Sequence, residues 1–162
     1  MRQTLFHTPT AYSVLRLNLS RIIATTADNL KPCLVSSLML AYAQHVLVQG
    51  SSFHSFAHQI LPTVESLRQM DILHVFFEKG MPQCLRYTWQ HSLIRPWGHL
   101  LPVQCEGCGR IRSWLSVRTT EPAILFACRG CEKKLKFLRP EKFKWLGLES
   151  NGGRWMVIDE TN

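Results

Sequence analysis

The segment VQCEGCGRIR, residues 103–112, carries two cysteines separated by two other residues. A second pair with the same spacing follows in CRGC, residues 128–131, so the full pattern is C-x2-C-x19-C-x2-C. Two cysteines spaced in this way in a tight turn can direct both sulfur atoms at one point, about 2.3 Å from a tetrahedral zinc ion. The pattern therefore predicts a four-cysteine metal site built from Cys105, Cys108, Cys128 and Cys131.

The residues around these cysteines favour zinc over other uses of paired cysteines. Gly107 and Gly130 relieve crowding inside the two turns, and Gly109 can adopt the positive φ needed on leaving the first. A thioredoxin-like motif would begin a helix after a βαβ pattern, whereas both pairs here adjoin strand-like sequence. Two disulfides would require an oxidising compartment, for which no secretory signal is visible. An iron–sulfur cluster, disulfides and coincidence remain the alternatives.

Four cysteine ligands would leave no open position on the metal. A catalytic zinc usually has three protein ligands and a bound water. We therefore expect one structural Zn²⁺, whose binding supplies folding free energy of about 10–16 kcal/mol in zinc-finger peptides. Four thiolates and one Zn²⁺ together carry a charge of −2, so the formal charge of +8 falls to about +6.

The sequence after residue 103 predicts a small all-β module. Residues 111–117, 123–128 and 133–138 are short β-prone segments, and the segments 144–148 and 154–159 flank SNGG as a hairpin. Residues 103–139 resemble a zinc ribbon, with CEGCGR as the first knuckle and FACRGC as strand exit and second knuckle. This resemblance implies a structural class whose members serve in transcription, translation, replication and protein assembly, so it implies no single task.

The sequence before the cysteines predicts helices and one or two strands. Residues 32–49 carry an apolar helical stripe that begins near Pro32, and Ser51 or Ser52 can cap a second helix that Pro62 should kink or break. Residues 72–77 and 85–89 favour strands. Residues 86–102, RYTWQHSLIRPWGHLLP, followed by such a cysteine motif, are similar to uncharacterised fungal proteins, a similarity that implies no activity.

These patterns predict an α+β protein: a helical N-terminal region with one or two strands, then a small all-β four-cysteine zinc ribbon with a C-terminal hairpin that packs on it. The expected divisions are a weakly structured segment 1–31, an N-terminal region 32–94, an extended connector 95–102, and the zinc ribbon with its hairpin at 103–162.

Positive charge is concentrated in the half that contains the cysteine pairs. Residues 81–162 hold thirteen Lys and Arg against seven Asp and Glu, compared with six against four in residues 1–80. Such a basic region favours nucleic acid or an acidic protein surface as the partner. The candidate binding residues are Arg129, Lys133, Lys134, Lys136, Arg139, Lys142, Lys144 and Trp145. In the alternative interpretation, the aromatic side chains form a small core and the lysines only solvate its exterior.

Three classes of function follow. The first is a non-enzymatic zinc-binding module that presents a basic and aromatic surface to its partner, and the second is a protein–protein adaptor with a purely structural zinc. The third is a cysteine hydrolase using Cys84 with His54 or His58, or a fragment of a larger enzyme. His54 and His58 have metal-ligand spacing, but Ser55 stands where a zinc protease has glutamate, so no catalytic residue is assigned.

The N-terminal residues bear on localisation. No acidic residue precedes Asp28, and Arg2, Arg16 and Arg21 lie among Ser and Thr, a composition that also fits a mitochondrial transit peptide. Residues 15–20 alternate as a strand would. No apolar run reaches the roughly 18 residues of a membrane span. We expect an intracellular protein, nuclear or cytoplasmic, with no membrane partner.

Overall fold

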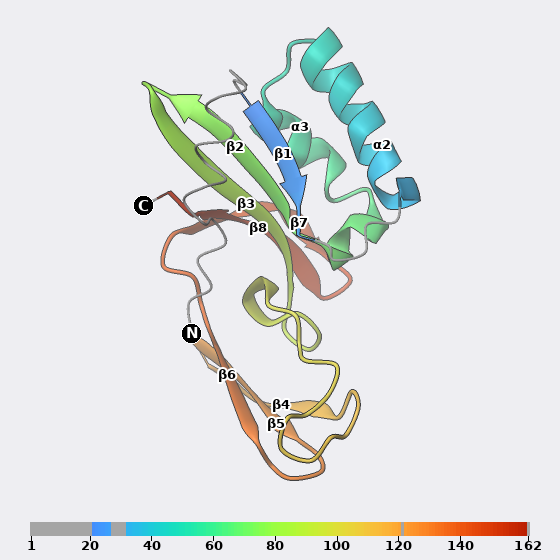
Figure 1. The fold of residues 1–162 in the computed structure, drawn as a ribbon, viewed down its shortest axis with the longest axis vertical. Coiled ribbons are helices and arrows are strands. Elements are labelled where there is room, and N and C mark those ends of the chain that lie inside the picture. Colours follow the sequence, from blue (N-terminus) through green and yellow to red (C-terminus); the bar gives the residue numbers. More distant parts are fainter. Residues whose placement is uncertain (1–20, 27–31, 121, 162) are drawn as a thin grey trace.

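The computed structural model of the chain describes residues 21–26, 32–120 and 122–161, without the side chains of residues 32–34 and 120. Within these residues, strands form two antiparallel sheets, and helices cover one of them (Figure 1). The five-stranded sheet has the order β1 (Arg21–Thr25), β2 (Ile72–Glu78), β3 (Met81–His91), β8 (Gly153–Asp159) and β7 (Phe143–Ser150). The three-stranded sheet has the order β4 (Trp114–Thr120), β5 (Ala123–Cys128) and β6 (Lys134–Leu138). The patterns expected in residues 1–20 lie outside the described residues.

The expected helices are confirmed. Helix α2 spans Pro32–Tyr42 and continues as a π-helical turn, η1, over Ala43–Val48. Helix α3 spans Phe53–Ile60, and the Ser55 N–H donates to the Ser52 hydroxyl at 3.1 Å, which caps its first turn. The helix ends before Pro62, and a 3₁₀ turn, η2, follows at Glu65–Gln69. None of the described helices is long and apolar enough to cross a membrane.

The first hydrophobic core lies between the helices and one face of the five-stranded sheet. Successive side chains of a strand point to opposite faces, so Tyr87 and Trp89 of β3 face the helices while Arg86 and Thr88 face away. Leu38 of α2 and Phe56 of α3 are each 1% exposed in this core. The apolar helical stripe read from the sequence therefore packs on the sheet.

A second core joins the two sheets. It contains Ile124 and Phe126 of β5, Met156 and Ile158 of β8, and Trp97 between them. Half-buried Trp114, Leu135, Phe137 and Phe143 pack against it. The five-stranded sheet thus packs against helices on one face, and on the other face its strand β8 packs against the three-stranded sheet.

The C-terminal hairpin forms as expected, but it belongs to a different sheet than the expected ribbon. Strand β8 pairs with β3, with Trp89 opposite Trp155, and β7 pairs with the other edge of β8. One face of β8 does pack on the three-stranded sheet through Met156 and Ile158. The physical reason is that β8 is apolar on both faces, which suits a central strand rather than the rim of a small module. The division of the chain at 95–102 stays a prediction.

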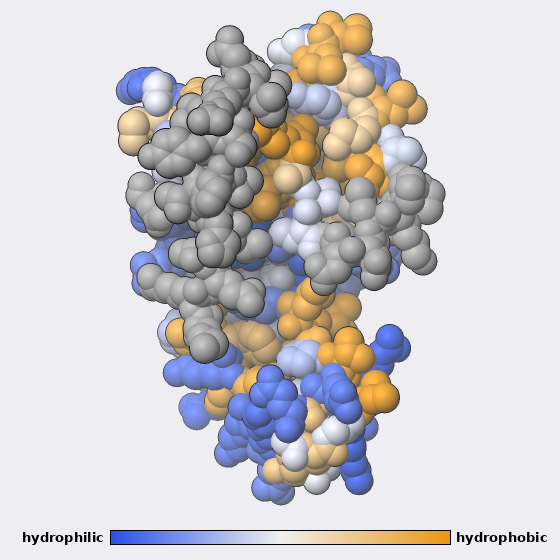
Figure 2. Space-filling model, viewed as in Figure 1, coloured by the Kyte–Doolittle hydropathy of each residue, from blue (hydrophilic) through white to orange (hydrophobic). Residues whose placement is uncertain are grey.

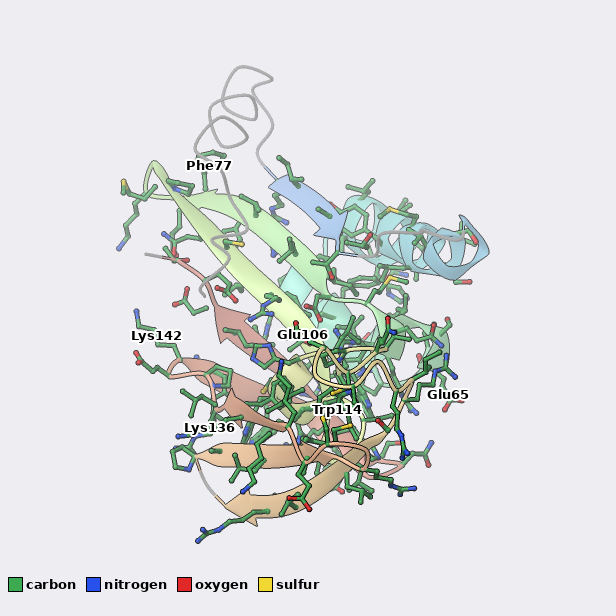
Figure 3. All side chains as sticks on the ribbon, turned by 60° about the horizontal axis from the view of Figure 1, so that its bottom comes forward. Glu65, Phe77, Glu106, Trp114, Lys136 and Lys142 are labelled. Atoms are coloured by element: carbon green, nitrogen blue, oxygen red, sulfur yellow. The ribbon has the colours of Figure 1, made fainter. Side chains whose placement is uncertain are left out.

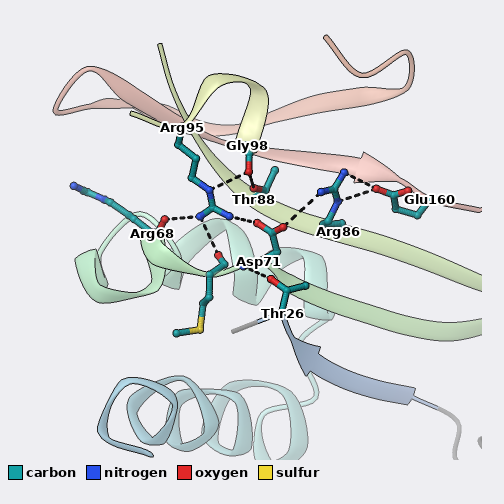
Figure 4. A network of polar contacts seen from close by, with 9 residues as sticks. Thr26, Arg68, Asp71, Arg86, Thr88, Arg95, Gly98 and Glu160 are labelled. Carbon is teal, nitrogen blue, oxygen red and sulfur yellow. Dashed lines mark hydrogen bonds and ion pairs between the residues drawn. The ribbon is translucent and has the colours of Figure 1, made fainter. Parts of the chain in front are cut away.

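Residues 95–102 were expected to be an extended connector, and this is wrong for their first part. Pro96–Gly98 forms a buried 3₁₀ turn, η3. Arg95, only 4% exposed, forms an ion pair with Asp71 and donates to the Gly98 carbonyl at 3.0 Å (Figure 4). Burial lowers the pKa of this guanidinium. The ion pair therefore holds the turn against the five-stranded sheet. Asp71 is too distant from Arg95 in the sequence for this pairing to be predicted.

Candidate metal centre

The four cysteines of the C-x2-C pairs converge on one point. Their Sγ atoms all lie within 4.8 Å of one another, with 3.7 Å between Cys105 and Cys131 and 3.6 Å between Cys108 and Cys128. A tetrahedron of thiolates about 2.3 Å from a central zinc has edges of about 3.8 Å. A disulfide needs about 2.05 Å, and all four cysteines are free. This cluster can hold one metal ion.

The two knuckles, residues 105–110 and 128–133, share one backbone hydrogen-bond pattern. In each, the first cysteine donates its N–H to the carbonyl five residues later and accepts at its own carbonyl from the N–H four residues later. These distances are 2.9 Å for Cys105 to Arg110 and for Cys128 to Lys133, 2.8 Å for Gly109 to Cys105, and 2.9 Å for Glu132 to Cys128. The repeated motif of the sequence is therefore a repeated structure.

Backbone and hydroxyl groups donate to the sulfur atoms that lie deepest. The N–H groups of Gly107 and Gly130 point at Cys105 Sγ and Cys128 Sγ, at 3.4 and 3.3 Å. Ser113 Oγ lies 3.2 Å from Cys128 Sγ. Hydrogen bonds from Ser113 and Gly130 lower the pKa of the Cys128 thiol to about 6. Ser113 was not predicted, because no spacing rule marks it.

Gly107 and Gly130, which lie inside the two C-x2-C pairs, fit closely against the opposite knuckle. A Cβ at Gly107 would lie 3.0 Å from Cys131 Sγ, and one at Gly130 would lie 2.9 Å from Cys108 Sγ and 2.5 Å from Arg110 Cδ. A side chain at position 130 would require Arg110 and Cys108 to shift, and one at position 107 would crowd Cys131. Arg110, which no sequence pattern marked, therefore packs across the second knuckle.

A cation also lies across the first knuckle. Lys133 Nζ forms an ion pair with Glu106 at 2.7 Å, which links the two knuckles. Lys133 was predicted to belong to the partner-binding surface, whereas here it is half-buried and paired. Cys105 and Cys128 are each 1% exposed, while Cys108 and Cys131 are exposed, so the centre lies at the surface with one side buried.

The remaining predicted binding residues belong to different elements of the structure. Lys134 and Lys136 are exposed on β6, and Arg129 is exposed in the second knuckle. Lys142 and Lys144 line a hollow of about 460 Å³ beside His54 of α3. In Figure 3, Lys142 and Lys136 lie on the same side of the view, one above the other, and come from different elements. The basic residues between 129 and 144 therefore divide among the second knuckle, β6 and the hollow beside β7.

The aromatic side chains near the basic residues lie mostly inside. Phe137 packs on Phe126 with ring centroids 5.9 Å apart, and Trp155 is buried in the helix-side core. Trp145 is 38% exposed, and the Arg154 guanidinium lies 5.3 Å from its ring centroid. Arg139 lies over the Phe143 ring at 5.9 Å. Lys136 of β6 points away from the face that holds Phe137, so lysines and rings are on opposite sides of this strand.

The solvent-facing side of the three-stranded sheet, here called the outer face, consists of cross-strand rows. One row runs Lys136, Leu125, Arg118 and the next runs Lys134, Ala127, Leu115, from β6 through β5 to β4. Val117, at the β-bulge of β4, and Leu138 of β6 are also exposed. Figure 2 shows hydrophilic residues gathered over this end of the molecule. Arg118 was missed because register between strands cannot be read from one strand.

The cysteine-hydrolase constellation does not assemble. Leu85 of β3 packs on the helix side of the sheet, so Cys84 points to the opposite face. His54 and His58 are exposed on α3, on the helix side. Burial raises the pKa of the Cys84 thiol to about 11, which disfavours the thiolate.

Comparison of the chain with protein-family models, with curated proteins and with solved structures finds no match.

Proposed function

We propose that this chain is a non-enzymatic zinc-binding protein, in which one structural Zn²⁺ shapes a zinc ribbon that presents a basic surface to nucleic acid or to an acidic protein. The observation that carries the proposal is the set of four Sγ atoms with spacings of 3.6 and 3.7 Å, close to the edge of a zinc–thiolate tetrahedron.

The ligand set supports zinc in a structural role. Thiolates suit zinc among the divalent metals, and four of them complete its tetrahedral sphere, so no position is left for a reacting water. Two knuckles at the ends of antiparallel strands are the arrangement of a zinc ribbon. A reducing compartment, nuclear or cytoplasmic, would keep the thiols available to the metal.

The charge supports an anionic partner. Lys134 and Lys136 are exposed on β6, and Arg118 is exposed on β4 of the same face. The adaptor alternative gains from the inward position of Phe137 and Phe126, because rings in the inter-sheet core cannot stack on bases.

Metal analysis of the purified full chain tests the first half of the proposal. We expect one zinc per chain, and chelation should unfold the three-stranded sheet. A metal-free sample that keeps this sheet, or iron in place of zinc, would overturn it.

Retention on immobilised heparin, a generic polyanion, tests the second half. Retention of the zinc-loaded chain should fall with salt and with the double substitution Lys134→Glu and Lys136→Glu. A chain that heparin does not retain at low salt would refute an anionic partner.

A further inference from the structure

The outer face has an apolar floor with different borders on its two sides. The middle strand β5 contributes Leu125 and Ala127 to the floor. The β6 border carries Lys134, Lys136 and the exposed Leu138, whereas the β4 border carries Leu115 and Val117, which are 44% and 61% exposed, with Arg118 beside them. Exposed apolar side chains occur at many places on this protein, and Leu115, Val117 and Leu138 are the ones that lie on this face.

The described residues of this face carry only positive charge. Arg118, Lys134 and Lys136 lie on it, while Glu106 and Glu132 belong to the knuckles. Charge complementarity therefore calls for carboxylates or phosphates opposite β6. The aliphatic floor decides between them, because single-stranded nucleic acid binds by stacking its bases on aromatic rings. The rings of this sheet, Phe126 and Phe137, lie in the inter-sheet core instead.

The spacing of the borders matches an extended chain. Lys134 and Lys136 stand two residues apart on β6, which is about 6.7 Å in a strand, the same repeat as side chains i and i+2 of any extended segment. If an extended segment lay along β5 with its side chains pointing toward β4 and β6, every second side chain would point toward these lysines. The other set would meet Leu115 and Val117 of β4.

We infer that the outer face binds an extended protein segment in which acidic and apolar residues alternate, with the acidic side chains against Lys134 and Lys136 and the apolar ones against Leu115 and Val117. This inference rests on the proposed function, since it names the partner of the same basic surface.

The test is fluorescence anisotropy with the zinc-loaded full chain and a labelled peptide of alternating Glu and Val. The double variant Lys134→Glu, Lys136→Glu should bind this peptide at least about tenfold more weakly. The matched control is Lys142→Glu, Lys144→Glu, which changes the net charge equally but just before and within β7, and its binding should stay within about twofold of the parent. Zinc content and circular dichroism verify that each variant is folded, and Lys134→Ala, Lys136→Ala replaces the first pair if it is not.

A second pair of variants tests the apolar border. Leu115→Ser with Val117→Ser keeps every charge and should still weaken binding about fivefold. A peptide of the same composition with its Glu and Val in separate blocks should also bind more weakly than the alternating one.

Three outcomes would overturn the inference. If polydeoxythymidylate displaces the peptide and binds more tightly, the face takes nucleic acid, and the proposed function survives without the inference. If both lysine pairs weaken peptide binding equally, the attraction is only net charge. If heparin retains the chain through Lys134 and Lys136 while the peptide does not bind, the inference fails alone, whereas failure of both probes removes the proposed function as well.

Discussion

The five-stranded sheet and the three-stranded sheet reach stability by different routes. The former has helices on one face and meets the other sheet through β8 on its second face, and its central strands bury residues as large as Tyr87 and Trp155. The latter buries one face only and carries four cysteines that can hold a metal at its end. A small sheet with a single covered face cannot bury much apolar surface. The difference indicates that the first region depends on packing and the second on its metal.

Substitution of a buried ligand should have the largest effect and should separate the two regions. With Cys105→Ser we expect zinc to be lost, together with folding free energy on the order of 10 kcal/mol or more by analogy with zinc-finger peptides. Hydrogen exchange should show lost protection in β4–β6, while β2, β3 and the inner part of α3 keep most of theirs. The control Cys84→Ser should retain full zinc content. Equal loss of protection in both sheets would mean that they fold as one unit.

The second prediction concerns the ion pair that fastens the turn at 95–98 to the five-stranded sheet. Asp71→Ala leaves Arg95 buried without its carboxylate, which should cost about 3–5 kcal/mol in urea unfolding. The control is Glu65→Ala, which removes an exposed ion pair with Arg68 and should cost less than about 1 kcal/mol. A small effect of Asp71→Ala would mean that this ion pair does not hold the turn against the five-stranded sheet.

Acid should destabilise the helix-covered region through His74, which stacks between Phe53 and Phe76. Burial, aided by Arg21, lowers its pKa from 6.5 to about 4. Between these values the unfolded chain binds a proton that the folded chain does not, so stability falls as pH drops from 6.5 toward 4, by on the order of 2–3 kcal/mol. The free energy of unfolding in urea should depend less on pH across this window for His74→Phe than for the parent. If the free energies of unfolding of variant and parent fall equally with pH, other groups cause the acid sensitivity.

The smallest effects are expected from substitutions at equivalent positions of the two knuckles. Gly109 and Glu132 occupy equivalent positions with φ of +71° and +59°. Gly109→Ala should therefore destabilise the module by about 1–2 kcal/mol, whereas Glu132→Gly should stabilise it by about 0.5–1 kcal/mol. Thermal unfolding of the zinc-loaded chain measures both. Shifts of the same sign would contradict the equivalence of the two turns.

Local patterns predicted the elements well. The stripe after Pro32, the cap at Ser52 and the break at Pro62 all appear in the structure, because helix signals depend on residues a few positions apart. The site was predicted for the same reason, since each C-x2-C turn is a local feature. Ser113 and Arg110, which complete the centre, carry no such local signal.

The sequence by itself determined the cysteine cluster, the helices and most strands, because turn geometry and side-chain periodicity are properties of short segments. Only the tertiary structure decided that β8 pairs with β3 and that Arg95 is buried against Asp71. It also decided that the basic residues between 129 and 144 divide between β6 and the hollow beside β7. Those outcomes depend on strand register and on contacts between residues far apart in the chain. The outer face also comes from register, because Arg118, Leu125 and Lys136 meet only when three strands align.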